Sequence, residues 1–187
     1  MGVNMPKITI SGYPGSGTST LVSGLVSHFN WQSINGGQIF RDEAAKRGLS
    51  LAEFGIICVN DESVDQELDE ILRQNISGAD VEIIESRLAG WWAYKLGVKS
   101  IRIWVEVNEH ERANRVISRE GGSLEDVLEA NAKRLAIDNQ RYQNMYGLTP
   151  DDPLAYTHII EASNISAEDV LSHAIKTVSY THLRAHE

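Results

Sequence analysis

Short apolar stretches alternate along the chain with longer stretches in which apolar residues recur at helical spacing. Five stretches rich in β-branched residues predict strands, at about 6–11, 31–34, 80–86, 100–107 and 157–162. Apolar residues three or four positions apart predict helices between them, at about 17–29, 38–46, 50–54, from 61 onward, 88–96, 108–119, 124–146 and 166–178. This alternation predicts an α/β fold with a five-stranded parallel sheet and helices on both faces.

Glycine and small polar residues mark the expected ends of several helices. The pair Gly36-Gly37 predicts a turn before the helix at 38–46. Ser50, with Glu53 three positions later, forms the pattern of a capping box. Gly147 follows the helix at 124–146, where a C-terminal capping glycine is expected.

A glycine-rich segment joins the first strand to the first helix. Strand, glycine-rich turn and helix are the context in which backbone N–H groups bind phosphate. We therefore expect this segment to hold the phosphates of a nucleotide, through Gly12, Tyr13, Pro14, Gly15, Ser16, Gly17, Thr18, Ser19 and Thr20. The alternative is a plain turn between a strand and a helix.

The segment departs from the phosphate-loop pattern G-x-x-x-x-G-K-[ST] at one position. Thr18 stands where the pattern has lysine, whose positive charge reaches the β- and γ-phosphates. Thr18 offers a hydroxyl and a backbone N–H but no charge. Ser19 stands where the hydroxyl that binds Mg²⁺ is expected.

Three charged side chains are expected close to this loop. Ligands of open α/β sheets bind beyond the carboxyl ends of the strands. Arg41 and Arg87 follow the second and third strands, and a guanidinium group suits the phosphate of an acceptor nucleotide. Glu85 ends the third strand and could hold a water on Mg²⁺. The alternatives are surface ion pairs, with Asp42 or Glu85 as partners, and a helix N-cap role for Glu85.

Two helices rich in arginine predict a lid. On the first helix, one face carries Arg112, Arg115 and Arg119. On the second helix, one face carries Arg134, Asp138 and Arg141. The pair Gly121-Gly122 between them predicts a hinge. Phosphoryl transfer needs positive charge around the moving group and exclusion of water, which such a lid provides. The alternative is two solvated helix faces with internal ion pairs, such as Glu111 with Arg115.

Composition limits the classes of partner. The net charge of −9 over 187 residues argues against a broad surface for a nucleic-acid polymer. No run of eighteen apolar residues predicts a membrane span, and no apolar signal segment opens the chain, which favours the cytoplasm. Cys58 is the single cysteine, and its apolar neighbours predict a buried, inert thiol. The histidines show no metal-binding spacing.

Two further pairs of residues lie outside this site. Asp65 and Asp69 are one helical turn apart, and we expect them to be surface residues or partners of arginine. We expect Trp91 and Trp92 to pack their helix against the sheet.

Several segments together resemble one family of enzymes. They are 8–12, Gly37-Gln38-Ile39-Phe40-Arg41, 51–54, Asp65 with Asp69, Glu85-Ser86-Arg87-Leu88-Ala89-Gly90, Arg119-Glu120, Arg141-Tyr142 and Tyr146-Gly147. From about residue 7 to 147 the chain resembles the short, archaeal-type cytidylate kinases of the nucleoside monophosphate kinase superfamily.

The resemblance implies a phosphate-loop kinase that transfers the γ-phosphoryl group of ATP to CMP or dCMP with Mg²⁺. In such an enzyme Arg41, Arg87 and Asp138 would contact the acceptor nucleotide, and Ser19 and Glu85 would serve the metal, Glu85 through water. Thr18, Arg115, Arg119, Arg134 and Arg141 would surround the transferring group. A kinase for another monophosphate, such as UMP or AMP, or for another small molecule, and a non-catalytic nucleotide-binding protein that lost its lysine are the alternatives.

We expect one domain over residues 1–178, monomeric, with a nucleoside-monophosphate-binding part at about 36–76 and a lid at about 112–141. The segment 179–187 does not continue the pattern of the preceding helix. It is similar to read-through from a sequencing adapter, and a non-native tail without a functional site is expected there.

Overall fold

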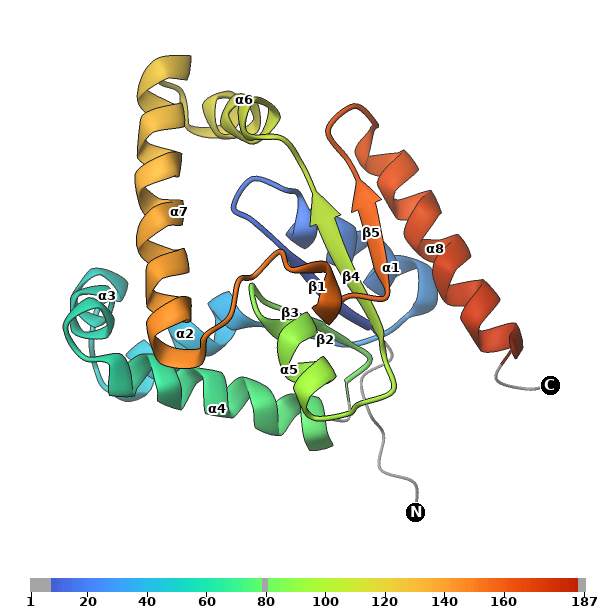
Figure 1. The fold of residues 1–187 in the computed structure, drawn as a ribbon, viewed down its shortest axis with the longest axis horizontal. Helices are drawn as coiled ribbons and strands as arrows, with labels where there is room; N and C mark the ends of the chain where they lie inside the picture. The colour runs from blue at the N-terminus through green and yellow to red at the C-terminus, as the bar shows by residue number, and fades with distance from the viewer. Residues whose placement is uncertain (1–7, 79–80, 185–187) are drawn as a thin grey trace.

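A five-stranded parallel sheet forms the centre of the molecule (Figure 1). The computed structural model describes residues 8–78 and 81–184. The strands are β1 (Ile8–Gly12), β2 (Ser33–Asn35), β3 (Ile83–Glu85), β4 (Ile101–Glu106) and β5 (His158–Glu161). Their order is β2-β3-β1-β4-β5, and every neighbouring pair is parallel. The fold class predicted from the sequence is confirmed.

Helices connect the strands and enclose the sheet. They are α1 (Thr18–Phe29), α2 (Gly36–Lys46), α3 (Leu51–Asn60), α4 (Glu62–Gly78), α5 (Ala89–Lys95), α6 (Glu109–Glu120), α7 (Leu124–Tyr146) and α8 (Ala167–Arg184), with a 3-10 turn, η1, at Pro153–Ala155. Figure 1 shows α7 standing away from the sheet, with one end at α6 and the other near α2 and α4.

Two apolar layers hold helices to the opposite faces of the sheet. On one face α1 and α8 pack on the strands, where Leu25 and Val178 are fully buried. On the other face α4 and α5 pack against Ile84 and Trp104. Trp91 and Trp92 belong to this second layer, as the sequence predicted. Burial of this apolar surface is the main force that fixes the strand order.

A smaller apolar cluster joins α2, α3 and α4 beside the sheet. It contains Ala44, Phe54, Cys58 and Val64. Cys58 is 4% exposed, so the predicted burial of this thiol is confirmed. These three helices therefore have a core of their own next to the carboxyl end of β2.

Two of the predicted helix caps are confirmed and one predicted turn is wrong. Ser50 and Glu53 form the capping box, and Gly147 ends α7 with φ 64°. Gly36 and Gly37 are not a turn but the first residues of α2, because the side chain of Asn35 accepts a hydrogen bond from the N–H of Gln38 at 2.6 Å. That cap lets the helix begin directly at the end of β2.

The prediction that residues 179–184 leave the helical pattern is also wrong. Helix α8 continues to Arg184. Within it the hydroxyl of Thr181 donates to the carbonyl of Thr177 at 2.9 Å, which is compatible with helix. Residues 185–187 of the expected tail lie outside the described residues.

Gly90 provides a test of the packing between α5 and the sheet. A Cβ atom at this position would overlap Cε1 of Tyr156, a buried ring whose hydroxyl donates to the carbonyl of Pro150. We expect Gly90→Ala to lower the free energy of unfolding by about 1–3 kcal/mol. Gly55→Ala in α3, where a Cβ atom meets nothing within 4 Å, should instead stabilise by about 0.5–1 kcal/mol. Urea denaturation of both variants measures the difference, and equal destabilisation would contradict this account.

Candidate active site

The glycine-rich loop between β1 and α1 exposes backbone N–H groups at the carboxyl edge of the sheet. Gly15 and Gly17 have φ values of 86° and 83°, a left-handed conformation that favours glycine. Gly17 is the N-cap of α1, so the first N–H groups of that helix have no acceptor within it. They point, with the positive end of the helix dipole, at whatever binds over the loop.

Two side chains of the loop face the core. Tyr13 is buried with its ring edge-on to Trp104, at 5.0 Å between centroids, and burial raises the pKa of Tyr13 to about 12. The Ser16 side chain is buried as well. A cavity of about 410 Å³ lies over the loop, and Tyr13 lines it whereas Ser16 does not. The other lining residues include Gly12, Pro14, Gly15, Gly17, Thr18, Ser19, Thr20, Arg115 and Arg119.

One carboxylate ties the start of α1 to the end of β3. Thr18 donates its hydroxyl to Glu85 Oε1 at 2.6 Å, and the Ser19 hydroxyl donates to the same oxygen at 3.2 Å. Hydroxyl and carboxylate oxygens are the ligands that Mg²⁺ prefers, and it commonly completes its shell with water and phosphate. Among residues 8–78 and 81–184, no group of three or more His, Cys, Asp or Glu side chains is placed to hold a metal. The two hydroxyls and the carboxylate at this position are oxygen donors of the kind that fits Mg²⁺.

Arg115 lies against the glycine-rich loop. Its Nη1 donates to the carbonyl of Ser16 at 3.2 Å and to that of Gly15 at 3.4 Å, and Nη2 donates to Ala162 at 2.9 Å. Nε pairs with Glu111 at 2.8 Å, so the intrahelical ion pair considered as an alternative is present at the same time. A positive charge thus lies beside the loop that lacks the lysine.

The prediction that Arg112, Arg115 and Arg119 share one face of α6 toward the ligand is only partly correct. Arg119 is exposed and pairs with Glu120, while lining the cavity over the loop. Arg112 is buried, with its guanidinium 5.3 Å from the centroid of the Tyr13 ring, and its Nε donates to the carbonyl of Val107 at 3.1 Å. Arg112 also packs α6 against the loop, since a Cβ atom at Gly15 would lie only 3.0 Å from the carbonyl oxygen of Arg112.

A larger cavity, of about 630 Å³, lies between α2, α3, α4 and α7. Arg41, Arg87, Arg134, Asp138 and Arg141 all line it, so the structure brings these predicted residues together. Arg41 donates to Gln38 at 2.8 Å, and Arg87 pairs with Asp138 at 3.1 Å. These partners differ from the neighbouring carboxylates Asp42 and Glu85 that the sequence offered as alternatives.

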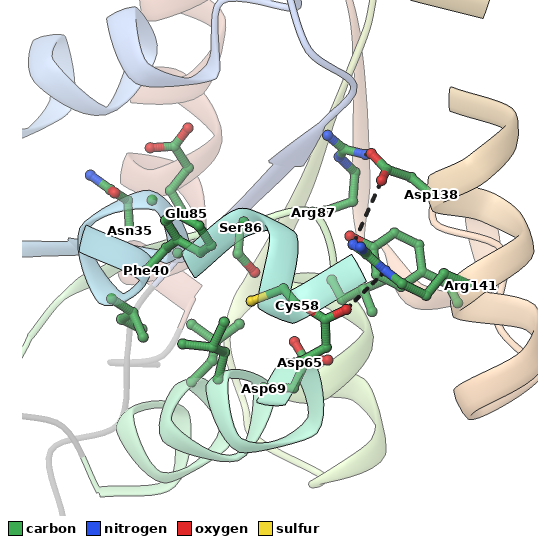
Figure 2. A pocket seen from close by; sticks show the side chains of 18 of the residues that line it. Asn35, Phe40, Cys58, Asp65, Asp69, Glu85, Ser86, Arg87, Asp138 and Arg141 are labelled. Carbon is green, nitrogen blue, oxygen red and sulfur yellow. Dashed lines mark hydrogen bonds and ion pairs between the residues drawn. The ribbon is translucent and has the colours of Figure 1, made fainter. Parts of the chain in front are cut away.

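Four charged side chains form a continuous chain of ion pairs along one wall of this cavity (Figure 2). Asp138 joins Arg87 to Arg141, whose Nη2 lies 3.6 Å from it. Arg141 Nε lies 3.2 Å from Asp65, which confirms Asp65 as a partner of arginine. Desolvation raises the pKa of Asp65 against the opposing effect of Arg141. The chain connects α4, α7 and the segment after β3.

Of the two positions expected for Asp69, an exposed surface site is wrong, because α4 turns this residue into the cavity beside Asp65. Arg73 and Arg141 both act on its charge, in the direction that lowers its pKa. Its Oδ2 accepts a hydrogen bond from the hydroxyl of Tyr146 on α7 at 2.6 Å. Burial raises the pKa of Asp69 to about 6.

The two cavities meet at four side chains. Ser19, Glu85, Ser86 and Arg87 line both. Ser86 was absent from the predicted site, and its buried hydroxyl has no hydrogen-bond partner in the part of the chain that the structure describes. The sequence did contain a signal for Ser86, because it directly follows β3, at the edge of the sheet where ligands of such folds bind. A ligand over the glycine-rich loop would therefore adjoin a ligand in the larger cavity.

Comparison with known proteins gives a consistent result. The family model described as an AAA domain matches residues 11–133. The chain is 39% identical over 149 residues to the cytidylate kinase of Halobacterium salinarum, which covers 80% of this chain and 77% of that protein. It is 37% identical over 183 residues to the cytidylate kinase of Pyrococcus abyssi, covering 96% of this chain and 98% of that protein.

Solved structures agree on the fold. A shikimate kinase from Acinetobacter baumannii matches with a TM-score of 0.57 at 14% identity, over 96% of each chain. A gluconokinase from Sinorhizobium meliloti matches with a TM-score of 0.62 at 12% identity, over 97% of this chain and 95% of that one. With the glycine-rich loop and the two adjoining cavities on one edge of the sheet, the sequence identities show that this chain belongs to the cytidylate kinase family.

Proposed function

We propose that this protein transfers the γ-phosphoryl group of ATP to CMP or dCMP, which yields ADP and the cytidine diphosphate. The curated relatives named cytidylate kinase support this activity. The observation that carries it is the meeting of the two cavities at Ser19, Glu85, Ser86 and Arg87. A phosphoryl group can pass directly from one ligand to the other only where their sites adjoin.

In this proposal the glycine-rich loop holds the phosphates of ATP. Residues 12–20 offer backbone N–H groups and the start of α1, which together favour an anion. Ser19 would bind Mg²⁺ directly and Glu85 through water, and the ion would neutralise charge on the β- and γ-phosphates when bound.

The larger cavity would hold the acceptor. Arg41 and Arg87 would bind its phosphate, and Asp138 would orient Arg87 or accept a hydrogen bond from a sugar hydroxyl. A nucleoside monophosphate is already an anion at neutral pH. The protein therefore needs no general base, and catalysis consists of positioning and charge stabilisation.

Arginines would replace the charge of the absent lysine. Thr18 contributes a hydroxyl that Glu85 engages, whereas Arg115 already lies at the loop. Arg119, Arg134 and Arg141 would approach the transferring group from the lid. One charge-assisted hydrogen bond contributes about 1.5–3 kcal/mol, so a few of these arginines suffice to compensate.

Two parts of the molecule would move around a fixed sheet. The acceptor-binding part at 36–76 has its own small apolar cluster, and the proposed lid at 112–141 contains Gly121 and Gly122 at φ 81° and 106°. Such glycines absorb backbone rotation at a hinge.

Throughout the described ranges, no helix combines the length and apolarity needed to cross a membrane. We propose a monomer that acts on free nucleotides.

A panel of acceptors tests the activity. With ATP and Mg²⁺, we expect ADP release with CMP and dCMP, and much slower release with UMP, AMP and GMP. Chromatography of the nucleotides measures each rate. Turnover confined to UMP or AMP would contradict the acceptor, and ATP binding without turnover at saturating CMP would contradict catalysis.

The arginines of α7 test the lid. We expect Arg134→Ala and Arg141→Ala each to lower kcat by about tenfold to a hundredfold, because each removes a positive charge from the transferring group. Lys133→Ala is the matched control, since this exposed residue of the same helix pairs with Glu129 at 2.7 Å and does not line the cavity. Unchanged kcat in both arginine variants would contradict a catalytic lid.

The hydroxyl of Thr18 has a separate test. Thr18→Val removes the hydrogen bond to Glu85 while keeping the shape of the side chain, and Thr18→Ser keeps the hydroxyl. We expect kcat/KM for ATP to fall about tenfold in Thr18→Val and to change little in Thr18→Ser. Equal values for the two variants would show that the hydroxyl has no part in holding Glu85 for catalysis.

A further inference from the structure

The cavity proposed for the acceptor has two chemically different kinds of lining. Arg41, Arg87 and Arg134 offer positive charge that suits a phosphate, and Arg87 also lines the cavity over the glycine-rich loop. Leu68 and Leu72 of α4 and Met145 of α7 offer apolar surface that suits the flat face of a nucleobase.

Two carboxylates of α4, Asp65 and Asp69, line the cavity together with these apolar side chains. Figure 2 shows Asp65 and Asp69 close to Cys58, on the side of the cavity away from Glu85. Asp65 is engaged by Arg141, whereas Asp69 accepts a hydrogen bond from Tyr146 at Oδ2. The second oxygen of Asp69, Oδ1, takes no part in that hydrogen bond and belongs to a residue that lines the cavity.

We infer that Asp69 selects the base of the acceptor by accepting a hydrogen bond from the 4-amino group of cytosine. An ionised carboxylate only accepts hydrogen bonds. Cytosine presents a donor at position 4, whereas uracil presents an oxygen there, as thymine does. The same carboxylate would thus bind cytosine and repel uracil. This inference rests on the proposed function, and it assigns the specificity within that site.

The surroundings of Asp69 fix the orientation of its carboxylate. Tyr146 donates from α7 to Oδ2, and Asp69 is only partly exposed where it lines the cavity. A site with a buried polar group discriminates strongly, because the wrong ligand leaves that group unpaired. Asp69 acts here as a specificity-determining residue and takes no part in moving the phosphoryl group.

The elevated pKa of Asp69, about 6, adds a signature in the working range of pH. A protonated carboxyl can donate to the 4-oxo group of uracil, so discrimination should weaken as pH falls through this value. The titratable or charged groups that interact with Asp69 are Asp65 and Arg73 on α4 and Arg141, Tyr142 and Tyr146 on α7. Cys58 on α3 lies close by (Figure 2). Of these, Asp65 also has a raised pKa, so its variant is a necessary comparison.

The test compares kcat/KM for CMP and UMP at saturating ATP, with ADP measured by chromatography between pH 5.5 and 8. Dividing kcat/KM for CMP by kcat/KM for UMP removes the effect of titrating the nucleotide phosphate, because both nucleotides carry the same phosphate group. For the unmodified protein we expect a high ratio at pH 8 that falls toward pH 5.5. In Asp69→Asn we expect the ratio to fall by about 10- to 150-fold at pH 8, and to vary little with pH.

Two variants separate specificity from structure. Glu70→Gln changes the exposed neighbour of Asp69, which pairs with Arg73 at 3.3 Å, and should leave the ratio unchanged. Asp65→Asn should weaken both nucleotides to a similar extent, because it frees Arg141 rather than altering the base contact. A change of ratio in Asp65→Asn but not in Asp69→Asn would overturn the assignment.

Folding of Asp69→Asn is checked by its Tm. Because folding raises the pKa of Asp69, the stability that this group contributes is present below about pH 4 and is lost as pH rises through about 6. Asp69→Asn should therefore be at least as stable as the unmodified protein at pH 7. Should it fail to fold, the pH profile of the unmodified ratio decides the question.

The outcomes separate this inference from the proposed function. No turnover with any monophosphate would overturn the proposed function and this inference with it. Turnover of CMP with an unchanged ratio in Asp69→Asn, or a ratio independent of pH in the unmodified protein, would overturn this inference alone.

Discussion

The position of β1 at the centre of a parallel sheet is the constraint on which the site depends. β1 pairs with β4 over its whole length and with β3 from Ile8 to Ile10, so its carboxyl end extends past the end of β3. The turn into α1 must therefore lie next to the segment that follows β3. Thr18 and Ser19 meet Glu85 for this reason, and Gly15 meets the backbone of Arg112 at the start of α6.

Charge balance explains much of the remaining geometry. The chain carries a net charge of −9, yet its candidate ligands are anions. Arginines clustered at one edge of the sheet provide local positive charge for these anions despite the negative net charge. Carboxylates hold several of these arginines in place before any ligand is bound. Arg87 and Arg141 share Asp138, and Arg115 is held between Glu111 and the carbonyls of the loop. A half-buried guanidinium that is already paired loses less conformational freedom when a phosphate replaces its partner.

The sequence predicted the architecture well because local patterns determined it. Five apolar strands alternating with amphipathic helices left few alternatives to a parallel sheet, and the glycine-rich turn after β1 identified the loop. The start of α2 was wrong because a side-chain cap at Asn35 replaced the turn expected at Gly36 and Gly37.

The misplaced site residues share one cause. Helical spacing puts Arg112 with Arg115, but does not say which of them a neighbouring loop will cover. For Asp69, the spacing of charged residues along α4 is typical of a solvent-exposed helix face. Only the packing of α7 over α4 shows that the carboxylate faces a cavity and the hydroxyl of Tyr146. Contacts between segments distant in sequence decide such cases.

The burial of Cys58 has a practical consequence. It is the only cysteine of the chain, and it lies in the wall of the larger cavity, where burial raises the pKa of the thiol. At neutral pH the group stays protonated, so it reacts slowly with oxidants and alkylating reagents. Any label that reacts with a thiol can attach only at Cys58, and a nucleotide bound in the larger cavity would shield this thiol. The rate of labelling therefore reports whether the cavity is occupied.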